Sequence, residues 1–298
     1  MAELWRKHGR RAVTAVLAAA VMVSCVMMAR QERTYRESAG SYEEAAALAG
    51  KRRPSRPPAE EPEAEEAPEE APEEAPAERE PPPEEASELL GLDLGALRAV
   101  NGDVEGWIEI PGTELSYPLM QGEDNQYYLN HTWKGEANAA GSIFLEQTAS
   151  ADLSDFHTLV YGHRMRNGSM FATLKYYKDL SYWREHPRVY ILREGELYRY
   201  DIFSAFEAGV RGAVYRLDLE EKGLEEAFIQ YCLERTVIET GIVPEGEDRL
   251  LTLSTCTGNG HATRWIVQAR LAQVYGLEAP GEDAGAEEEP GGPEGKTA

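Results

Sequence analysis

The sequence is poor in cysteine and in basic residues. Of 298 residues only three are cysteine, and 53 acidic residues against 30 Lys and Arg give a formal net charge of −23. The acidic excess argues against a nucleic-acid partner, because nucleic acids are bound by clustered Lys and Arg. Beyond the N-terminal region only Cys232 and Cys256 remain, so no disulfide framework is expected, and a single bond between the two is the less favoured alternative.

Long apolar runs are also scarce. One uncharged apolar run, residues 12–29, approaches the roughly 20 residues that span a bilayer. Four basic residues within 1–11 precede it, so we expect a cytoplasmic segment over 1–11 and a transmembrane signal anchor over 12–29. A cleaved signal peptide is one alternative, although no clear small-x-small cleavage site follows the run. A lipoprotein-type processing site at Cys25 is another, although the run continues past it.

Apolar residues are almost absent from 59–88, where Glu-Glu-Ala-Pro is repeated. Such a segment has little to bury and its like charges repel, so we expect an extracellular disordered spacer over 30–88. A second segment of this character, 277–298, predicts a disordered acidic tail. Residues 89–276 remain as the folded domain, which is acidic in its own right and long enough for one hydrophobic core.

The folded part contains many short β-patterned runs broken by Gly, Pro, Asn and Asp. We expect a short helix over 89–100, a hairpin with its turn at 194–196, and an amphipathic helix over 220–235. Many short strands with few helices predict a mainly-β fold, a closed or nearly closed barrel with appended helices. Cys232 lies on the apolar face of the expected helix, so we interpret it as a core residue.

The stretch "RLLTLSTCTGNGHATRWIVQARLAQV" predicts two strands, 250–255 and 264–274, joined by a polar loop that begins with Cys256. By alternation, apolar side chains of both strands face the core, whereas Cys256 and Arg264 fall on the outer face. If the strands pair, the two residues are neighbours. A guanidinium there would favour the thiolate and could stabilise negative charge on a carbonyl oxygen.

A nucleophilic thiol needs a proton-transfer partner, which is usually histidine. His163 follows a strand end and a glycine in "HTLVYGHRMRNGSMF", which places it on an exposed rim. Taken alone, a histidine in a surface loop is more often without a function, so the residues themselves leave the choice open. The other candidates are His131, His157, His186 and His261.

The combination of "TLSTC", the arginine of "RWIVQARL" and "YGHRMRNGSMF" resembles the sortases, cysteine transpeptidases of the Gram-positive cell surface. The segment "NGDVEGWIEIPGTELSYPLMQGEDNQYYLNHTWKGEANAAGSIFLE" resembles the start of a class B sortase domain. The resemblance covers roughly Val100 to Tyr275. It implies an eight-stranded sortase-type β-barrel, and it departs from class B at Thr257, where members often have an acidic residue.

Carried over to this chain, the resemblance implies Cys256 as nucleophile, His163 as acid and base, and Arg264 as the oxyanion ligand. It implies cleavage of an LPXTG- or NPQTN-like sorting signal of surface proteins after Thr, a Cys thioester, and transfer to an amine of a peptidoglycan precursor or a pilin. No metal or cofactor is required. We name Ser254, Thr255 and Asn130 as further candidates for substrate contact.

Two alternatives remain beside a membrane-bound transpeptidase with an extracellular catalytic domain. An exported cysteine protease would use the same residues and release the acyl group to water. A non-catalytic wall-binding module would give no reason to keep the three residues together. Other thiol families fit poorly, because no "CGSCW"-like papain signature is present and "STCT" lacks the "SHGC" context of L,D-transpeptidases.

Overall fold

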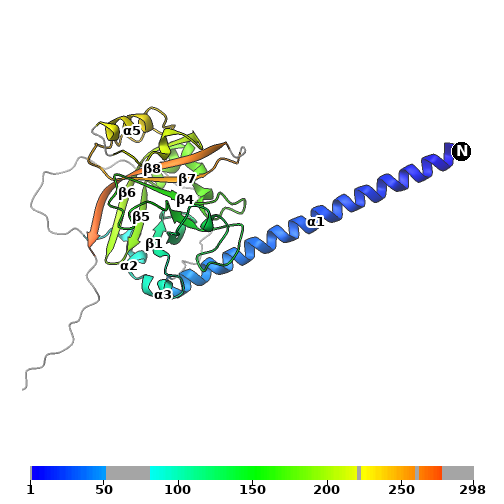
Figure 1. The fold of residues 1–298 in the computed structure, drawn as a ribbon, viewed down its shortest axis with the longest axis horizontal. Helices are drawn as coiled ribbons and strands as arrows, with labels where there is room; N and C mark the ends of the chain where they lie inside the picture. The colour runs from blue at the N-terminus through cyan, green and yellow to red at the C-terminus, as the bar shows by residue number, and fades with distance from the viewer. Residues whose placement is uncertain (1, 52–80, 220–222, 259–261, 277–298) are drawn as a thin grey trace, which may run out of the picture.

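The computed structural model describes residues 2–51, 81–219, 223–258 and 262–276, and side chains within α1 from residue 16 onward. The expected tail at 277–298, most of the Glu-Glu-Ala-Pro repeat and His261 therefore lie outside the described residues. Figure 1 shows a β-barrel with short helices at its margins and one long helix, α1, that leads away from it.

Eight strands close into a barrel in the order β1-β2-β3-β4-β7-β8-β6-β5, as the resemblance implied. Two neighbouring pairs, β2 with β3 and β4 with β7, are parallel, and the other pairs are antiparallel. The strands are β1 (Val104–Glu109), β2 (Ser116–Met120), β3 (Ile143–Leu145), β4 (His157–Tyr161), β5 (Arg188–Arg193), β6 (Glu196–Gly209), β7 (Leu250–Cys256) and β8 (Thr263–Gly276).

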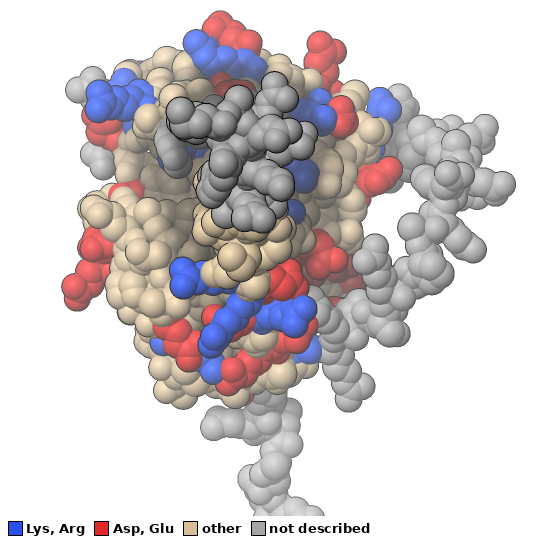
Figure 2. Space-filling view, turned by 90° about the vertical axis from the view of Figure 1, so that its right-hand side faces the viewer, with Lys and Arg blue, Asp and Glu red and all other residues tan. Residues whose placement is uncertain are grey.

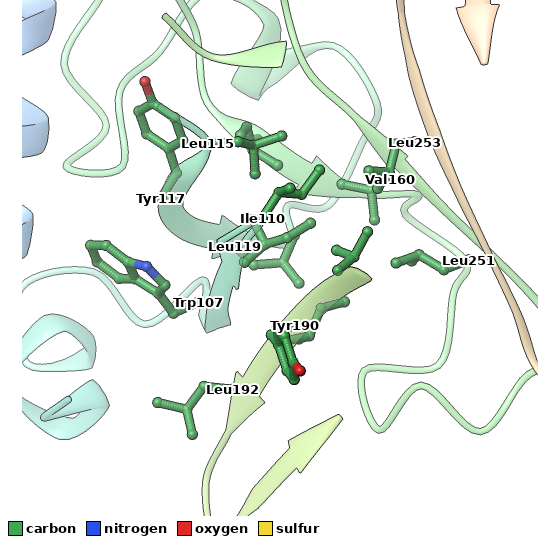
Figure 3. Packing of buried hydrophobic residues seen from close by; sticks show 14 of the residues in the cluster. Trp107, Ile110, Leu115, Tyr117, Leu119, Val160, Tyr190, Leu192, Leu251 and Leu253 are labelled. Atoms are coloured by element: carbon green, nitrogen blue, oxygen red, sulfur yellow. The ribbon is translucent and has the colours of Figure 1, made fainter. Parts of the chain in front are cut away.

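The barrel interior is filled by the inward-facing apolar side chains of its strands (Figure 3). Leu251 and Leu253 of β7 belong to this core, as the alternation predicted. The hairpin forms where it was expected, with Arg193 paired to Glu196 across the turn. The predicted strands at 250–255 and 264–274 are likewise present and paired with each other, which confirms this part of the pattern.

Helices lie around the barrel rather than in it. The α-helices are α1 (Ala2–Leu48), α2 (Ser87–Leu90), α3 (Leu94–Arg98), α4 (Leu180–Glu185) and α5 (Leu224–Leu233), and the 3-10 helices are η1 (Glu84–Ala86), η2 (Tyr127–Leu129), η3 (Phe171–Lys178) and η4 (Ala213–Tyr215). The helix expected over 89–100 is thus two short helices, α2 and α3, separated at Gly91.

A second apolar cluster covers the outer face of β6, β7 and β8. Phe228 and Cys232 of α5 pack there against Phe206, Leu250 and Ile266. Cys232 is fully buried and is not in a disulfide, which confirms its interpretation as a core residue. The outer face of β7 is therefore buried except at its end, where Cys256 is partly exposed.

The structure differs from the expected spacer and domain boundary. Residues 30–48 are helical as part of α1, and Tyr42, Ala45 and Ala49 are buried in the same core as the barrel strands. The physical reason is that this segment carries small and aromatic residues on one helical face, which the low-complexity character of 59–88 concealed. The folded unit therefore includes residues on the N-terminal side of residue 89.

No helix in the described part of the chain is long and apolar enough to cross a membrane. The side chains of 2–15, which include the start of the predicted anchor, lie outside that part. On the folded part, acidic and basic side chains are interspersed on the face that Figure 2 displays.

Candidate active site

Cys256 and Arg264 are directly opposed residues of the antiparallel strands β7 and β8. Both are partly exposed, so a substrate can reach the thiol and the guanidinium. Arg264 Nη1 donates a hydrogen bond to its neighbour's carbonyl, Thr263 O, at 3.0 Å. The expectation that the two side chains are neighbours on the outer face at the strand ends is confirmed.

His163 reaches the same place from β4, the parallel neighbour of β7. Tyr161 of β4 is paired with Ser254 of β7. His163 follows two residues after Tyr161, and Cys256 follows two residues after Ser254. The backbone continues in register past the strand end, because Gly162 N donates to Ser254 O at 3.2 Å. The side chains of His163 and Cys256 are close enough that each shifts the pKa of the other.

Gly162 lets the chain pack closely against Phe171 at this point. A Cβ on Gly162 would lie 2.7 Å from the ring of Phe171, a distance that real Cβ atoms do not show. Phe171 is fully buried, and its N–H donates to His163 O at 2.9 Å. The glycine before the histidine in "YGH" therefore allows the histidine backbone to rest against a rigid part of the core.

The orientation of the His163 ring is fixed by a backbone carbonyl. His163 Nε2 lies 2.7 Å from Leu129 O, and a carbonyl oxygen only accepts, so Nε2 carries a proton. Nδ1 is then the nitrogen left to exchange a proton with the Cys256 thiol. Nothing in the sequence pointed to this partner, because Leu129 contributes only its backbone.

The site shifts Cys256 toward the thiolate and His163 toward the imidazolium. The hydrogen bond from His163 lowers the pKa of the Cys256 thiol against the effect of partial burial, and the positive charges of Arg264 and Arg164 act in the same direction. The same hydrogen bond to Cys256 raises the pKa of His163, with a further contribution from the Leu129 carbonyl. A nucleophile and a proton donor are thus present together.

Arg164 is a residue of this site that the sequence motifs did not single out. Its Nη1 donates to Thr257 O, which ties the loop after His163 to the residue after Cys256. The guanidinium rests against Gly258, where a Cβ would lie 3.0 Å from Nη1. Thr257, the departure from the class B pattern, is buried and its hydroxyl lies 3.1 Å from that of Thr263, so it joins the two ends of the β7–β8 loop.

The three residues named for substrate contact are placed differently from one another. Ser254 lies on the face of Cys256 but is buried, with Oγ 2.9 Å from the hydroxyl of Tyr215 in η4. Thr255 is buried on the opposite face of the strand. Asn130 is exposed, directly after Leu129. No contact with a substrate is tested for any of them, so these roles stay predictions.

The other described histidines have partners of their own. His131 stacks on Tyr127, and His186 Nδ1 lies 2.9 Å from Pro111 O. His157 is buried, and burial lowers its pKa to about 4. Its ring joins Arg216 O, at 2.9 Å, to Thr252 Oγ1, at 2.8 Å, which makes it a structural cross-link.

In the described part of the chain, no three His, Cys, Asp or Glu side chains are grouped in a way that could hold a metal ion. The grouping of a cysteine, a histidine and an arginine is the chemistry that the site offers. The catalytic roles of these three residues stay predictions.

Comparison with known proteins relates this chain to one protein family. Residues 108–272 match the family described as "Sortase domain". Sortase B of Listeria monocytogenes is 35% identical over 181 residues, which cover 60% of this chain and 74% of that protein. Sortase B of Staphylococcus aureus is 30% identical over 181 residues, which again cover 60% of this chain and 74% of that protein.

Solved structures similar to this chain are also sortase B structures. A Staphylococcus aureus sortase B–substrate complex superposes with a TM-score of 0.57 at 29% identity, covering 60% of this chain and 84% of that one. A sortase B complexed with triglycine superposes with a TM-score of 0.57 at 28% identity, covering 60% and 85%. The family match includes His163, Cys256 and Arg264. This chain belongs to the sortase family of cysteine transpeptidases, among its class B members.

Proposed function

We propose that the protein is a membrane-anchored transpeptidase that cleaves a C-terminal sorting signal of LPXTG or NPQTN type and transfers the acyl group to an amine. The observation that carries the proposal is the meeting of Cys256, His163 and Arg264 at the open end of β7 and β8. The reaction needs a nucleophile, a proton carrier and an oxyanion ligand, and these three side chains can supply them.

In the first half-reaction the Cys256 thiolate attacks the carbonyl carbon of the signal's threonine. The carbonyl oxygen becomes an oxyanion, which the Arg264 guanidinium stabilises from the adjacent strand. Collapse of this intermediate breaks the C–N bond. His163 as imidazolium gives its Nδ1 proton to the leaving amine, and the acyl group remains on Sγ as a thioester.

In the second half-reaction an incoming amine attacks the thioester carbonyl. Neutral His163, still protonated at Nε2 by its bond to Leu129 O, takes the amine's proton at Nδ1. The C–S bond then breaks, the thiolate returns and an amide is formed. Because one histidine serves both steps, the hydrogen bond that fixes its ring orientation matters in both.

The substrate and acceptor classes are supported by what related structures contain. One relative was solved as a sortase B–substrate complex and another as sortase B complexed with triglycine, a short peptide with a free amine. By analogy we propose sorting-signal peptides of surface proteins as acyl donors, and an amine of a peptidoglycan precursor or a pilin as acceptor.

We also propose that residues 12–29 are the anchor and that the catalytic domain is extracellular. Within α1, the apolar side chains of Val16, Leu17, Val21, Met22, Val23, Val26, Met27 and Met28 are each more than half exposed, which is costly in water. Extraction of membranes at high pH tests this proposal. The full chain should stay in the membrane fraction, whereas a chain that lacks residues 1–29 should be released.

Hydrolysis is the competing activity, because water could resolve the same thioester. The two are separated by product analysis of a signal peptide with and without triglycine. A transpeptidase gives the peptide–triglycine amide as the main product when the amine is present. Free acid as the sole product at saturating amine would instead make the protein a protease.

A further inference from the structure

The C-terminal half of α1 is fastened to the loop between β2 and β3. The hydroxyl of Tyr42 donates to Gly141 O and lies 3.2 Å from Ser142 Oγ, and both contacts are buried. Trp133 Nε1 donates to Ser41 O at 2.9 Å, and Trp133 is fully buried. Helix and loop are therefore joined by hydrogen bonds that water does not reach.

The helix is also held to the barrel itself. The ring of Tyr42 packs edge-on against Tyr117 of β2, with centroids 5.1 Å apart. Just past the helix, Lys51 binds Glu109 of β1 and, at 2.6 Å, Ser116 Oγ. Figure 1 shows that this docked part and the long projecting part are one continuous helix.

Within the loop, residues 141–142 support residues 128–131. Ser142 N donates to Tyr128 O at 2.8 Å, and Ser142 Oγ donates to His131 O at 2.9 Å. Gly141 is packed so closely that a Cβ there would lie 2.7 Å from Leu129 O. Tyr42 therefore contacts Gly141 and Ser142, the same two residues that pack against or hydrogen-bond to the segment containing Leu129.

Leu129 in turn sets the ring of His163, because its carbonyl accepts the Nε2 proton at 2.7 Å. A chain of contacts therefore runs from Tyr42 through Gly141 and Ser142 to Leu129 and the histidine. Each link is a hydrogen bond or a close packing contact of backbone or hydroxyl atoms, which have less freedom to adjust than the ends of long side chains.

We propose that α1, through Tyr42, is a positioning element for His163, so that the helix proposed as the membrane anchor also sets the geometry of the active site. The proposal deepens the proposed function and rests on it for the role of His163. Tyr42 is a positioning residue and touches no reacting atom. The segment directly after residues 12–29, which the sequence predicted to be a disordered spacer, is instead a continuous helix that packs on the barrel.

The physical consequence is a change in proton affinity and alignment at His163. Cys256 raises the pKa of His163 most and the hydrogen bond to the Leu129 carbonyl adds to this, while burial and the positive charge of Arg264 lower it. If the loop relaxes, this hydrogen bond lengthens, the pKa of His163 falls, and Nδ1 is no longer held toward the thiol. Displacements of about 1 Å in a catalytic group can cost up to a hundredfold in rate.

The experiment compares Tyr42→Phe and Tyr42→Ala with a matched control in the full chain. Tyr35→Phe is the control, because Tyr35 lies on the same helix and its hydroxyl accepts a hydrogen bond from Gln31 of that helix. Proton NMR of the ring C2–H gives the pKa of His163 in a Cys256→Ala background, where the thiol does not titrate. Kinetics on signal peptides, with Cys256 present, give kcat and KM.

Tyr42→Phe keeps the ring and removes only the hydroxyl bonds. We expect it to lower the pKa of His163 and kcat, with about tenfold loss of kcat and little change in KM, while Tyr35→Phe changes neither. Tyr42→Ala should lose more. An unchanged His163 pKa in Tyr42→Phe would overturn the coupling whether or not His163 is catalytic, and an equal effect of Tyr35→Phe would overturn the specific role of Tyr42. If parent kinetics show no acyl transfer, the proposed function fails separately from this NMR result.

Discussion

Cys256 and Arg264 face each other across the antiparallel pair of β7 and β8, at the end where β7 stops. The cation acts on the thiol by lowering its pKa, and the position also suits an oxyanion formed beside Sγ. Arg264→Ala should therefore lower kcat by roughly a hundredfold, the usual loss for one oxyanion donor. Steady-state kinetics on a signal peptide measure it.

Arg264→Lys separates charge from geometry. Lysine keeps the positive charge but loses the planar fork of donors, so it should recover only a small part of the loss. KM should change much less than kcat. Full activity of the lysine variant would mean that a nearby charge suffices, and an effect confined to KM would make Arg264 a substrate-binding residue.

The two cysteines of the folded part provide a matched pair for the nucleophile. Cys256 is partly exposed next to His163, whereas Cys232 of α5 is buried against the barrel, and burial raises its pKa to about 12. Cys256→Ala should abolish cleavage of signal peptides, and Cys232→Ala should leave most activity. Both variants should keep the circular dichroism spectrum of the parent. Turnover by Cys256→Ala would contradict the assignment.

The proton sharing between Cys256 and His163 predicts a pH dependence of thiol reactivity. An unperturbed cysteine thiol has a pKa of 9.0, and the interaction with His163 lowers the pKa of Cys256 below it. Because the thiolate is the reactive form, alkylation by iodoacetamide should stay fast at pH values below 9. His163→Ala removes the largest cause of the lowering. The apparent pKa of alkylation should then move upward, and a profile identical to that of the parent would show that the histidine does not act on the thiol.

Arg164 should contribute to the same profile by a smaller amount. It binds Thr257 O beside the thiol and its charge lowers the pKa of Cys256 as the last of several causes. Arg164→Gln should raise the apparent pKa of alkylation less than His163→Ala does. Arg166→Gln is the control, because Arg166 is exposed and is not among those causes. Equal shifts in both variants would point to the general charge of the loop.

His157 predicts how stability depends on pH. Its folded-state pKa of about 4 lies below the ordinary value of 6.5, so the unfolded chain takes up a proton that the folded one refuses. Protonation of His157 therefore does not reduce the free energy of unfolding above pH 6.5. As pH falls from there toward about 4, the free energy of unfolding decreases by up to about 1.4 kcal/mol per pH unit. Urea unfolding at several pH values measures it. His157→Gln should flatten the dependence in this window.

Periodicity was enough to predict the elements that carry the site. The alternation along 250–255 and 264–274 placed Cys256 and Arg264 as outer-face neighbours, because a strand has a period of two and the pair is local in sequence. His163 could be selected only through the family resemblance. Its approach to Cys256 depends on the parallel pairing of β4 with β7, which no local pattern encodes.

The parts that sequence reasoning missed act through the backbone or through distant packing. Leu129 holds His163 by a carbonyl, and any residue type has one. Tyr42 was assigned to a spacer because the repeat at 59–88 dominates the composition of that region, yet its ring and hydroxyl are buried against the barrel. Tyr42 and Gly141 are 99 positions apart, and a contact over such a separation leaves no trace in local hydrophobic periodicity.

Capture of the acyl-enzyme tests the central claim most directly. The full chain is mixed with a peptide library built around the LPXTG and NPQTN motifs, quenched in acid, and its intact mass and peptide masses are measured. We expect an adduct on Cys256 equal to the peptide up to its threonine, which disappears on addition of triglycine as the new amide forms. Peptide cleavage without any adduct on Cys256, and equal cleavage by Cys256→Ala, would contradict this claim.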